Sequence, residues 1–88
     1  MPARGPLAVV LYARPDCHLC AEAEQMLARI AGHIPLSVRV VDIDSDDYLQ
    51  RLYVLEIPVV CIGGVELARA PISEWWLEDA IEAFALGR

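Results

Sequence analysis

Short apolar runs alternate with amphipathic segments along the first half of the chain. The run Leu7–Ala13 is apolar and contains two valines, which predicts a buried strand. The segment after it carries an apolar stripe at helical spacing, formed by Ala23, Leu27, Ile30 and Ile34. This stripe predicts a helix over residues 17–31 that ends at Gly32, with Pro35 just beyond it. A second strand is predicted at residues 37–44.

The second half adds a short helix, a hairpin and a final helix. Ser45-Asp46-Asp47 supplies a cap and negative charge for a short helix whose apolar positions are Leu49, Leu52 and Tyr53. A third strand is predicted at residues 57–62. Gly63-Gly64 joins it to a fourth at residues 65–68, because glycine adopts the positive φ angles of tight hairpin turns. Pro71 and Ser73 open a last helix. Its core-facing residues are predicted to be Trp76, Leu77, Ala80, Ile81 and Phe84.

The predicted element order is βαβαββα. A helix between the first two strands implies a right-handed parallel crossover, whereas the hairpin adds antiparallel strands to the same sheet. We therefore expect one α/β domain over residues 1–88, with a mixed four-stranded sheet flanked by three helices. A chain of 88 residues is long enough for one core and too short for a second.

Acidic residues dominate the charge of the chain. Thirteen acidic residues against seven arginines and no lysine give a formal net charge of −6. This balance argues against nucleic acid or an anionic membrane surface as a partner. The apolar runs are strand-sized, far below the ~20 residues of a membrane helix. We expect a monomer whose partners are proteins or small thiols.

The first apolar run also has some features of a secretory signal, because Arg4 precedes it. The run is only seven residues long and ends in Arg14-Pro15, so a first strand explains it better. Without an export signal we expect a cytoplasmic protein. In that compartment three cysteines indicate redox or metal chemistry more than structural disulfides.

Cys17 and Cys20 stand where the first strand leads into the first helix, and a redox dithiol is the leading hypothesis for them. At positions i and i+3 their side chains lie about 5–6 Å apart on one helix face, close to disulfide range. Cys17 faces the free N–H groups and positive dipole end of the helix, which favour its thiolate and make it the expected nucleophile. Cys20 lies a turn deeper and is the expected resolving thiol.

The third cysteine, the two histidines and Trp75 have simpler structural explanations. Zinc needs four ligands, and His18, His33 and Cys61 are too scattered to complete a site with the cysteine pair, so we expect no metal. Cys61 lies roughly 10 Å along a strand from Pro58 and should be a buried apolar residue. We expect no function for His33. Trp75 either packs over a sheet edge or stands exposed as a contact residue, and packing is the favoured interpretation.

Together, the element order, Cys17-His18-Leu19-Cys20 and the strand entry Ile57-Pro58 resemble a glutaredoxin of the thioredoxin superfamily, over nearly the whole chain. The chain is most similar to short bacterial glutaredoxin-like proteins, which have counterparts of residues 41–46 and 57–60. The resemblance implies a thiol–disulfide oxidoreductase with a cis proline at Pro58 beside the catalytic cysteine. It also implies that Ile57 and Pro58 bind the substrate backbone and that Arg14 binds a carboxylate of glutathione.

The sequence departs from the family in two places. His18-Leu19 replaces Pro-Tyr between the cysteines, and the stretch from Arg69 to Glu74 replaces a second Gly-Gly that holds glutathione. The electron donor is therefore open between glutathione, as a co-substrate, and a thioredoxin-reductase-like enzyme; no tightly bound cofactor is expected. Two other functions stay open: an iron–sulfur cluster carrier or assembly protein, and a non-catalytic binding module with this fold.

Overall fold

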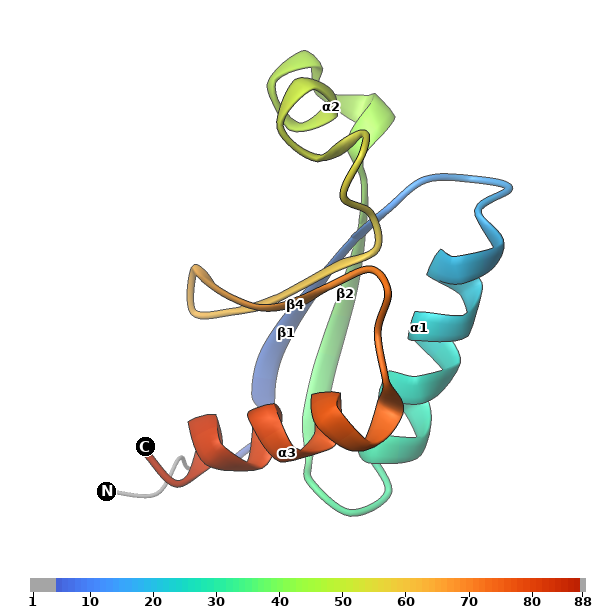
Figure 1. The fold of residues 1–88 in the computed structure, drawn as a ribbon. Coiled ribbons are helices and arrows are strands. Elements are labelled where there is room, and N and C mark those ends of the chain that lie inside the picture. The colour runs from blue at the N-terminus through green and yellow to red at the C-terminus, as the bar shows by residue number, and fades with distance from the viewer. Residues whose placement is uncertain (1–4, 88) are drawn as a thin grey trace.

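The computed structural model describes residues 5–87, so Arg4 lies outside the described part of the chain. Its element order confirms the predicted βαβαββα pattern, with one added 3₁₀ turn, η1. The elements are β1 (Leu7–Ala13), α1 (His18–Ile30), β2 (Leu36–Asp42), η1 (Ile43–Ser45), α2 (Asp47–Tyr53), β3 (Val59–Ile62), β4 (Val65–Arg69) and α3 (Glu74–Ala85). Figure 1 shows the three helices around the sheet. No helix among the described residues is both long and apolar enough to span a bilayer.

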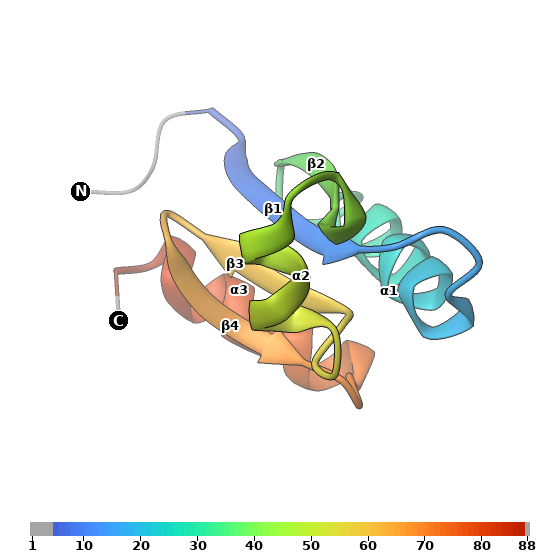
Figure 2. The same ribbon diagram turned by 90° about the horizontal axis from the view of Figure 1, so that it is seen from above.

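The four strands form one mixed sheet in the order β2-β1-β3-β4. β1 pairs parallel with β2 and antiparallel with β3, and β3 pairs antiparallel with β4 (Figure 2). Gly63 and Gly64 link the last two strands with φ angles of 57° and 79°, as a primed hairpin turn requires. The predicted parallel pairing of the first two strands and the predicted hairpin are both confirmed.

The main core lies between the sheet and the pair α1 and α3. Alternate residues of β1 are buried on this face, because successive side chains of a strand point to opposite sides. They pack with the apolar stripes of the two helices in one cluster that includes Ala23, Leu27, Ile30, Leu77 and Ile81. The stripe predicted for the first helix is thereby confirmed, with Ile34 half-buried against the cluster.

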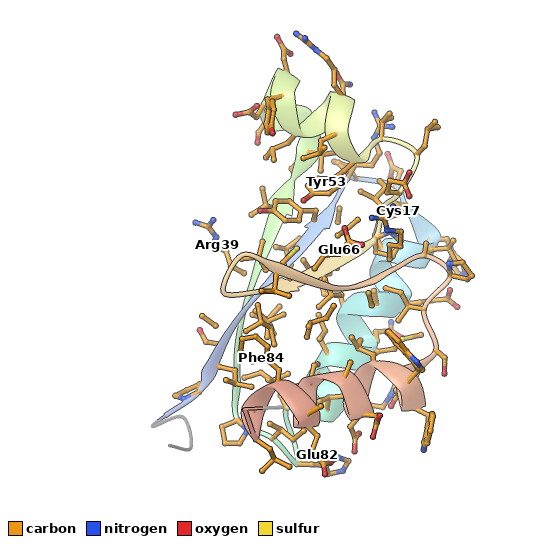
Figure 3. All side chains as sticks on the ribbon, turned by 60° about the vertical axis from the view of Figure 1, so that its left-hand side comes forward. Cys17, Arg39, Tyr53, Glu66, Glu82 and Phe84 are labelled. Atoms are coloured by element: carbon orange, nitrogen blue, oxygen red, sulfur yellow. A yellow bond between two sulfur atoms is a disulfide. The ribbon has the colours of Figure 1, made fainter. Side chains whose placement is uncertain are left out.

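The other sheet face is covered by α2 at one end. Tyr53 of α2, labelled in Figure 3, stacks on Tyr12 of β1, with 4.7 Å between ring centroids. Val10 and Tyr12 alternate with the core-facing residues of β1, so α2 lies opposite α1 and α3. This places the carboxyl end of β1 between α1 on one face and α2 on the other.

Several predicted boundaries move by a few residues. The second strand ends at Asp42 and not at residue 44, because the Asp42 carboxylate accepts a hydrogen bond from the Asp44 N–H at 2.9 Å and closes η1. The third strand begins at Val59 and not at residue 57. Ile57 instead donates its N–H to the Tyr53 carbonyl at 3.1 Å, which continues the last turn of α2.

Two tryptophan predictions are wrong. Trp76 does not face the core, since 52% of it is exposed, and Trp75 does not pack over a sheet edge, since 76% of it is exposed. α3 contacts the core through Leu77 and Ile81, which are fully buried. A helix turns about 100° per residue, so positions 75 and 76 both lie roughly 120–140° from the middle of the stripe that Leu77 and Ile81 form.

Candidate redox site

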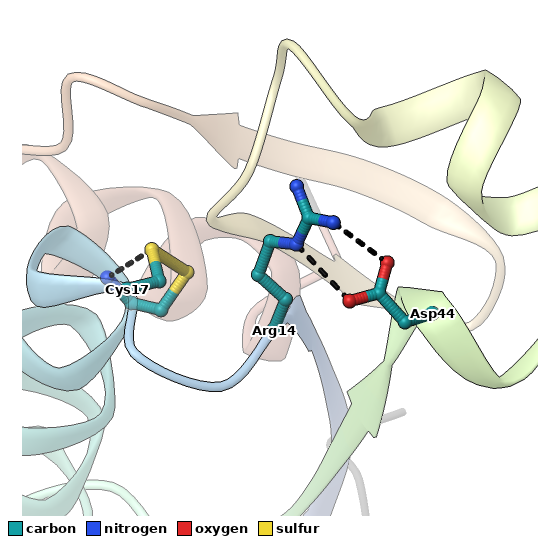
Figure 4. Close-up of a disulfide and its surroundings, with 4 residues drawn as sticks. Arg14, Cys17 and Asp44 are labelled. Atoms are coloured by element: carbon teal, nitrogen blue, oxygen red, sulfur yellow. Dashed lines mark hydrogen bonds and ion pairs between the residues drawn. A yellow bond between two sulfur atoms is a disulfide. The ribbon is translucent and has the colours of Figure 1, made fainter.

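Cys17 and Cys20 form a disulfide at the beginning of α1, with their Cα atoms 5.2 Å apart (Figure 4). Cys17 is the N-cap of the helix: its backbone is extended, and its Sγ accepts a hydrogen bond from the Cys20 N–H at 3.2 Å. The sulfur thereby accepts a hydrogen bond from one of the N–H groups that the beginning of a helix leaves without a backbone partner. The predicted placement of the dithiol at a helix N-terminus is confirmed.

The two sulfur-bearing residues differ in burial. Cys17 is half-buried, whereas only 4% of Cys20 is exposed and its side chain belongs to the core cluster. The residue before them, Asp16, has a φ of 59°, the left-handed conformation that non-glycine residues rarely adopt. The backbone thus turns sharply before α1 and leaves Cys17 as the more accessible sulfur of the pair.

Arg14 lines the site but is paired with a carboxylate of the protein. Its Nε and Nη2 atoms donate to the two carboxylate oxygens of Asp44 at 3.2 and 2.9 Å. In Figure 4 the Arg14 side chain lies between the disulfide and Asp44. Gln50 of α2 donates a further hydrogen bond to Asp44 at 3.2 Å. These contacts join the loop after β1, the turn η1 and α2 beside the disulfide.

An open hollow of about 640 Å³ adjoins the disulfide on the side of β2. Both cysteines and Arg14 line it, together with three acidic side chains. The acidic residues are Asp16, Glu24 and Asp42. Acidic side chains therefore outnumber the one arginine among the residues that border this space.

Pro58 lies on another side of the cysteine motif. The Ile57–Pro58 peptide is cis, as the family resemblance implies, and Pro58 is fully buried. A smaller hollow of about 80 Å³ brings Pro58 together with Leu19, from between the cysteines, and with Pro71 and Ile72 of the β4–α3 loop. Pro58 thus borders the same surface as the dithiol helix. The Ile57 N–H is bonded within the chain, to Tyr53.

The ion pairs around Arg69 hold the segment that leads to Pro58. Arg69 of β4 donates to Glu66 at 2.7 and 2.9 Å and to Glu56 at 3.0 Å. Glu56 directly precedes Ile57, so these bonds tie the loop to the edge strand. They are exposed, and each contributes little stability by itself.

The remaining cysteine and the histidines are remote from the dithiol or exposed. Cys61 is buried beside Val10 and Glu66, on the sheet face opposite the main core, which confirms the predicted apolar position. Burial, with the Glu66 charge, raises the pKa of its thiol. His33 contacts Glu78 at 3.3 Å, and His18 is exposed near Glu22. Within residues 5–87 no group of three or more histidine, cysteine or acidic side chains is placed to hold a metal ion.

Sequence reasoning missed two features of the site. Asp44 was noted only as part of a family-like segment, because its partner Arg14 is 30 positions away and neither residue identifies the other. The second cis peptide, Ala70–Pro71, also went unforeseen. For the pairing of Arg14 with Asp44, the sequence offered two signals: an arginine before the cysteines and an acidic run after the second strand.

Comparison with known proteins identifies a matching family and several similar solved structures. The model of the family described as Glutaredoxin-like domain (DUF836) matches residues 8–82. No curated protein matches the chain. The X-ray structure of protein XcR50 from X. campestris is 33% identical, with a TM-score of 0.75 over 85% of this chain and 96% of that one.

Two further structures extend the comparison. Protein Ne2328 from Nitrosomonas europaea, solved by NMR, is 28% identical with a TM-score of 0.79, over 94% of this chain and 95% of that one. Thioredoxin 1 from Thermosipho africanus is 19% identical with a TM-score of 0.66, over 89% and 93% of the two chains. At that identity the likeness concerns the fold alone, which is the α/β thioredoxin fold.

Proposed function

Because the chain belongs to the glutaredoxin-like domain family (DUF836), we propose that Cys17 and Cys20 are the redox-active dithiol of a thiol–disulfide oxidoreductase. The observation that carries the proposal is the disulfide at the beginning of α1, with one half-buried sulfur and one buried sulfur. A helix N-terminus favours the thiolate form of the residue that caps it, and the thiolate is the nucleophile in disulfide exchange.

The reaction has two exchange steps. In the reduced protein the Cys17 thiolate attacks one sulfur of a substrate disulfide, forms a mixed disulfide and releases the first substrate thiolate. Cys20, after losing its proton, attacks the Cys17 sulfur, which breaks the mixed disulfide and releases the second substrate thiolate. Two electrons pass to the substrate, and the protein is left with the Cys17–Cys20 disulfide. The hydrogen bond from the Cys20 N–H to the Cys17 sulfur favours the Cys17 thiolate that begins the first step.

Ile57 and Pro58 are proposed to align the substrate backbone. Pro58 lines the same hollow as Leu19 from between the cysteines, which supports a role for the Ile57–Pro58 peptide in holding a substrate chain. Because the Ile57 N–H is bonded to Tyr53, we propose that Ile57 offers its carbonyl oxygen as an acceptor for a substrate N–H. Arg14 is proposed as a further substrate contact, in exchange with its bonds to Asp44.

We propose that the protein works in the cytoplasm as a monomer, where a pool of reduced thiols returns the disulfide to the dithiol state. Glutathione and a reductase that uses a dithiol are the two classes of electron donor. A resident cofactor is not part of the reaction, since both exchange steps use only sulfur atoms of the protein and its substrates.

Trapping the intermediate tests the assignment of roles. Reduced Cys20→Ser protein mixed with a disulfide-containing peptide should accumulate a mixed disulfide on Cys17, detected by mass spectrometry of the intact protein. The Cys17→Ser variant should accumulate far less, and Cys61→Ser is the matched control that should behave as the wild type. Equal trapping by both single variants would contradict the roles assigned to Cys17 and Cys20.

The reduction potential tests the activity itself. Equilibration against glutathione and dithiothreitol buffers should give a reversible two-electron couple between roughly −180 and −270 mV, the range of reducing and exchanging members of this chemistry. A pair that does not cycle would contradict the proposal. Visible absorbance together with cluster-dependent dimerisation would contradict it in favour of an iron–sulfur carrier.

A further inference from the structure

The positive charge next to the disulfide is already neutralised by the protein. Arg14 lines the hollow together with both cysteines, yet its guanidinium makes two hydrogen bonds to the Asp44 carboxylate. We propose that Asp44 is a specificity-determining residue, which makes the dithiol site select neutral and cationic disulfides over anionic ones. The proposal rests on the oxidoreductase function and names the substrate class of that same site.

Asp44 is held in place by donors from two directions. Arg14 binds both of its oxygens, at 2.9 and 3.2 Å, and Gln50 of α2 donates to one of them at 3.2 Å. The bidentate fork of an arginine matches one carboxylate, so a carboxylate of an incoming substrate would have to displace Asp44 from the same two donors. Asp44 therefore competes directly with an anionic ligand for Arg14.

The surrounding charges act in the same direction. Asp16, Glu24 and Asp42 border the hollow that Arg14 lines, and Asp44 is hydrogen-bonded to the Arg14 guanidinium. Of the residues that line the hollow, His18 is the other basic one, and its side chain is 88% exposed near Glu22. Negative charge around a site lowers the encounter rate of an anion and raises that of a cation.

The substrate class that fits this surface is a disulfide flanked by neutral or basic groups, such as a protein disulfide with neighbouring arginine or lysine. A small disulfide that carries several carboxylates fits it poorly. The discrimination arises from charge beside Cys17 and does not depend on the two exchange steps, which are the same for every disulfide.

Three probe disulfides of similar size test the proposal: cystamine, which is cationic, bis(2-hydroxyethyl) disulfide, which is neutral, and 3,3′-dithiodipropionate, which is anionic. The rate at which each one oxidises the reduced wild-type protein is divided by its rate with dithiothreitol, a neutral dithiol, to remove intrinsic reactivity. We expect cystamine to exceed dithiodipropionate by about fivefold or more in about 20 mM salt, and the ratio to approach one in about 500 mM salt.

Asp44→Asn should raise the normalised rate with the anionic probe, because Arg14 is then free to bind it, and should lower the cationic-to-anionic ratio about threefold or more. The rate with the neutral probe should stay within about twofold, which separates charge selection from a general change in Cys17 reactivity. Asp79→Asn is the matched control: it removes the same charge from an exposed position of α3, and it should leave the ratio unchanged.

The possible results separate the selectivity proposal from the oxidoreductase function on which it rests. A wild-type ratio near one at low salt, or equal ratios in Asp44→Asn and Asp79→Asn, would overturn the selectivity proposal. If Asp44→Asn does not fold, the salt dependence of the wild-type ratio decides alone, and a flat dependence overturns the proposal. Failure of the reduced wild-type protein to react with any probe would instead overturn the oxidoreductase function.

Discussion

Replacing Asp16 by valine should destabilise the oxidised protein, because the backbone at this position is left-handed. The φ of Asp16 is 59°, in the turn between β1 and the N-cap Cys17. For residues with a Cβ atom this conformation costs roughly 1–2 kcal/mol, whereas asparagine and aspartate adopt it more readily through local hydrogen bonds of their short side chains. A β-branched residue should carry the full cost.

The comparison that isolates this effect is Asp16→Val against Asp16→Asn. Both variants remove the same negative charge, so a difference between them reports the backbone and not the electrostatics of the hollow. We expect Asp16→Val to be about 1 kcal/mol less stable than Asp16→Asn, because asparagine carries only part of the cost. Asp16→Gly should lie close to the wild type, since the released strain of about 1 kcal/mol is offset by ~0.4–1 kcal/mol of added chain entropy in the unfolded state.

Urea unfolding of the disulfide-bonded protein, followed by far-UV circular dichroism, measures these differences. With an m-value of about 1–3 kcal/mol/M for a small domain, a loss of about 1 kcal/mol lowers the midpoint by roughly 0.3–1 M. The disulfide must stay intact in every sample, so that all variants share one cross-linked unfolded state. Coincident midpoints for Asp16→Val and Asp16→Asn would refute the reasoning from the backbone conformation.

Three more expectations follow from other parts of the structure. Trp75→Ala should change the free energy of unfolding by no more than about 0.5 kcal/mol, because the side chain is exposed; a loss above about 2 kcal/mol in urea unfolding would show that it packs. The hydrogen bond from Arg29 lowers the pKa of Glu74, so the stability it contributes is present above the usual value of 4.5 and is lost as the pH falls through the lowered value of the folded state. Glu74→Gln should therefore show a shallower loss of stability between neutral and acid pH than the wild type, and an identical profile would contradict this. Burial raises the pKa of Cys61, so in protein whose other two cysteines are serine it should react slowly with iodoacetamide at neutral pH and faster as the pH rises or urea unfolds the chain; rapid labelling of the folded protein at neutral pH would contradict its burial.

Much of the fold was predictable because its signals are local. The bounds of β1 matched the apolar run Leu7–Ala13, and α1 differs from the predicted helix by one residue at each end. Its start is set by the N-cap geometry of Cys17, which the sequence indicated only to within a residue. The end of β2 was misjudged, since Ile43 continues the apolar pattern although the Asp42 carboxylate already bends the chain there.

The candidate site was predictable in its reacting atoms and not in its surroundings. The three-residue spacing of the cysteines at a strand-to-helix junction is a local pattern, and the structure places the pair there. The pairing of Arg14 with Asp44 spans 30 positions, and the acidic border of the hollow draws on β2 as well as α1. A residue's charge can be read from the sequence, whereas its ion-pair partner depends on how the strands are ordered in the sheet.

The sequence alone determined the elements, the parallel crossover, the hairpin and the position of the dithiol at the beginning of a helix. Each follows from side-chain periodicity or turn chemistry within a few residues. Only the tertiary structure decided that Asp44 pairs with the guanidinium of Arg14, that Leu19 and Pro58 border one hollow, and that Trp75 lies in solvent. These features depend on which segments far apart in the chain are brought into contact, and packing of the whole sheet with its helices sets those contacts.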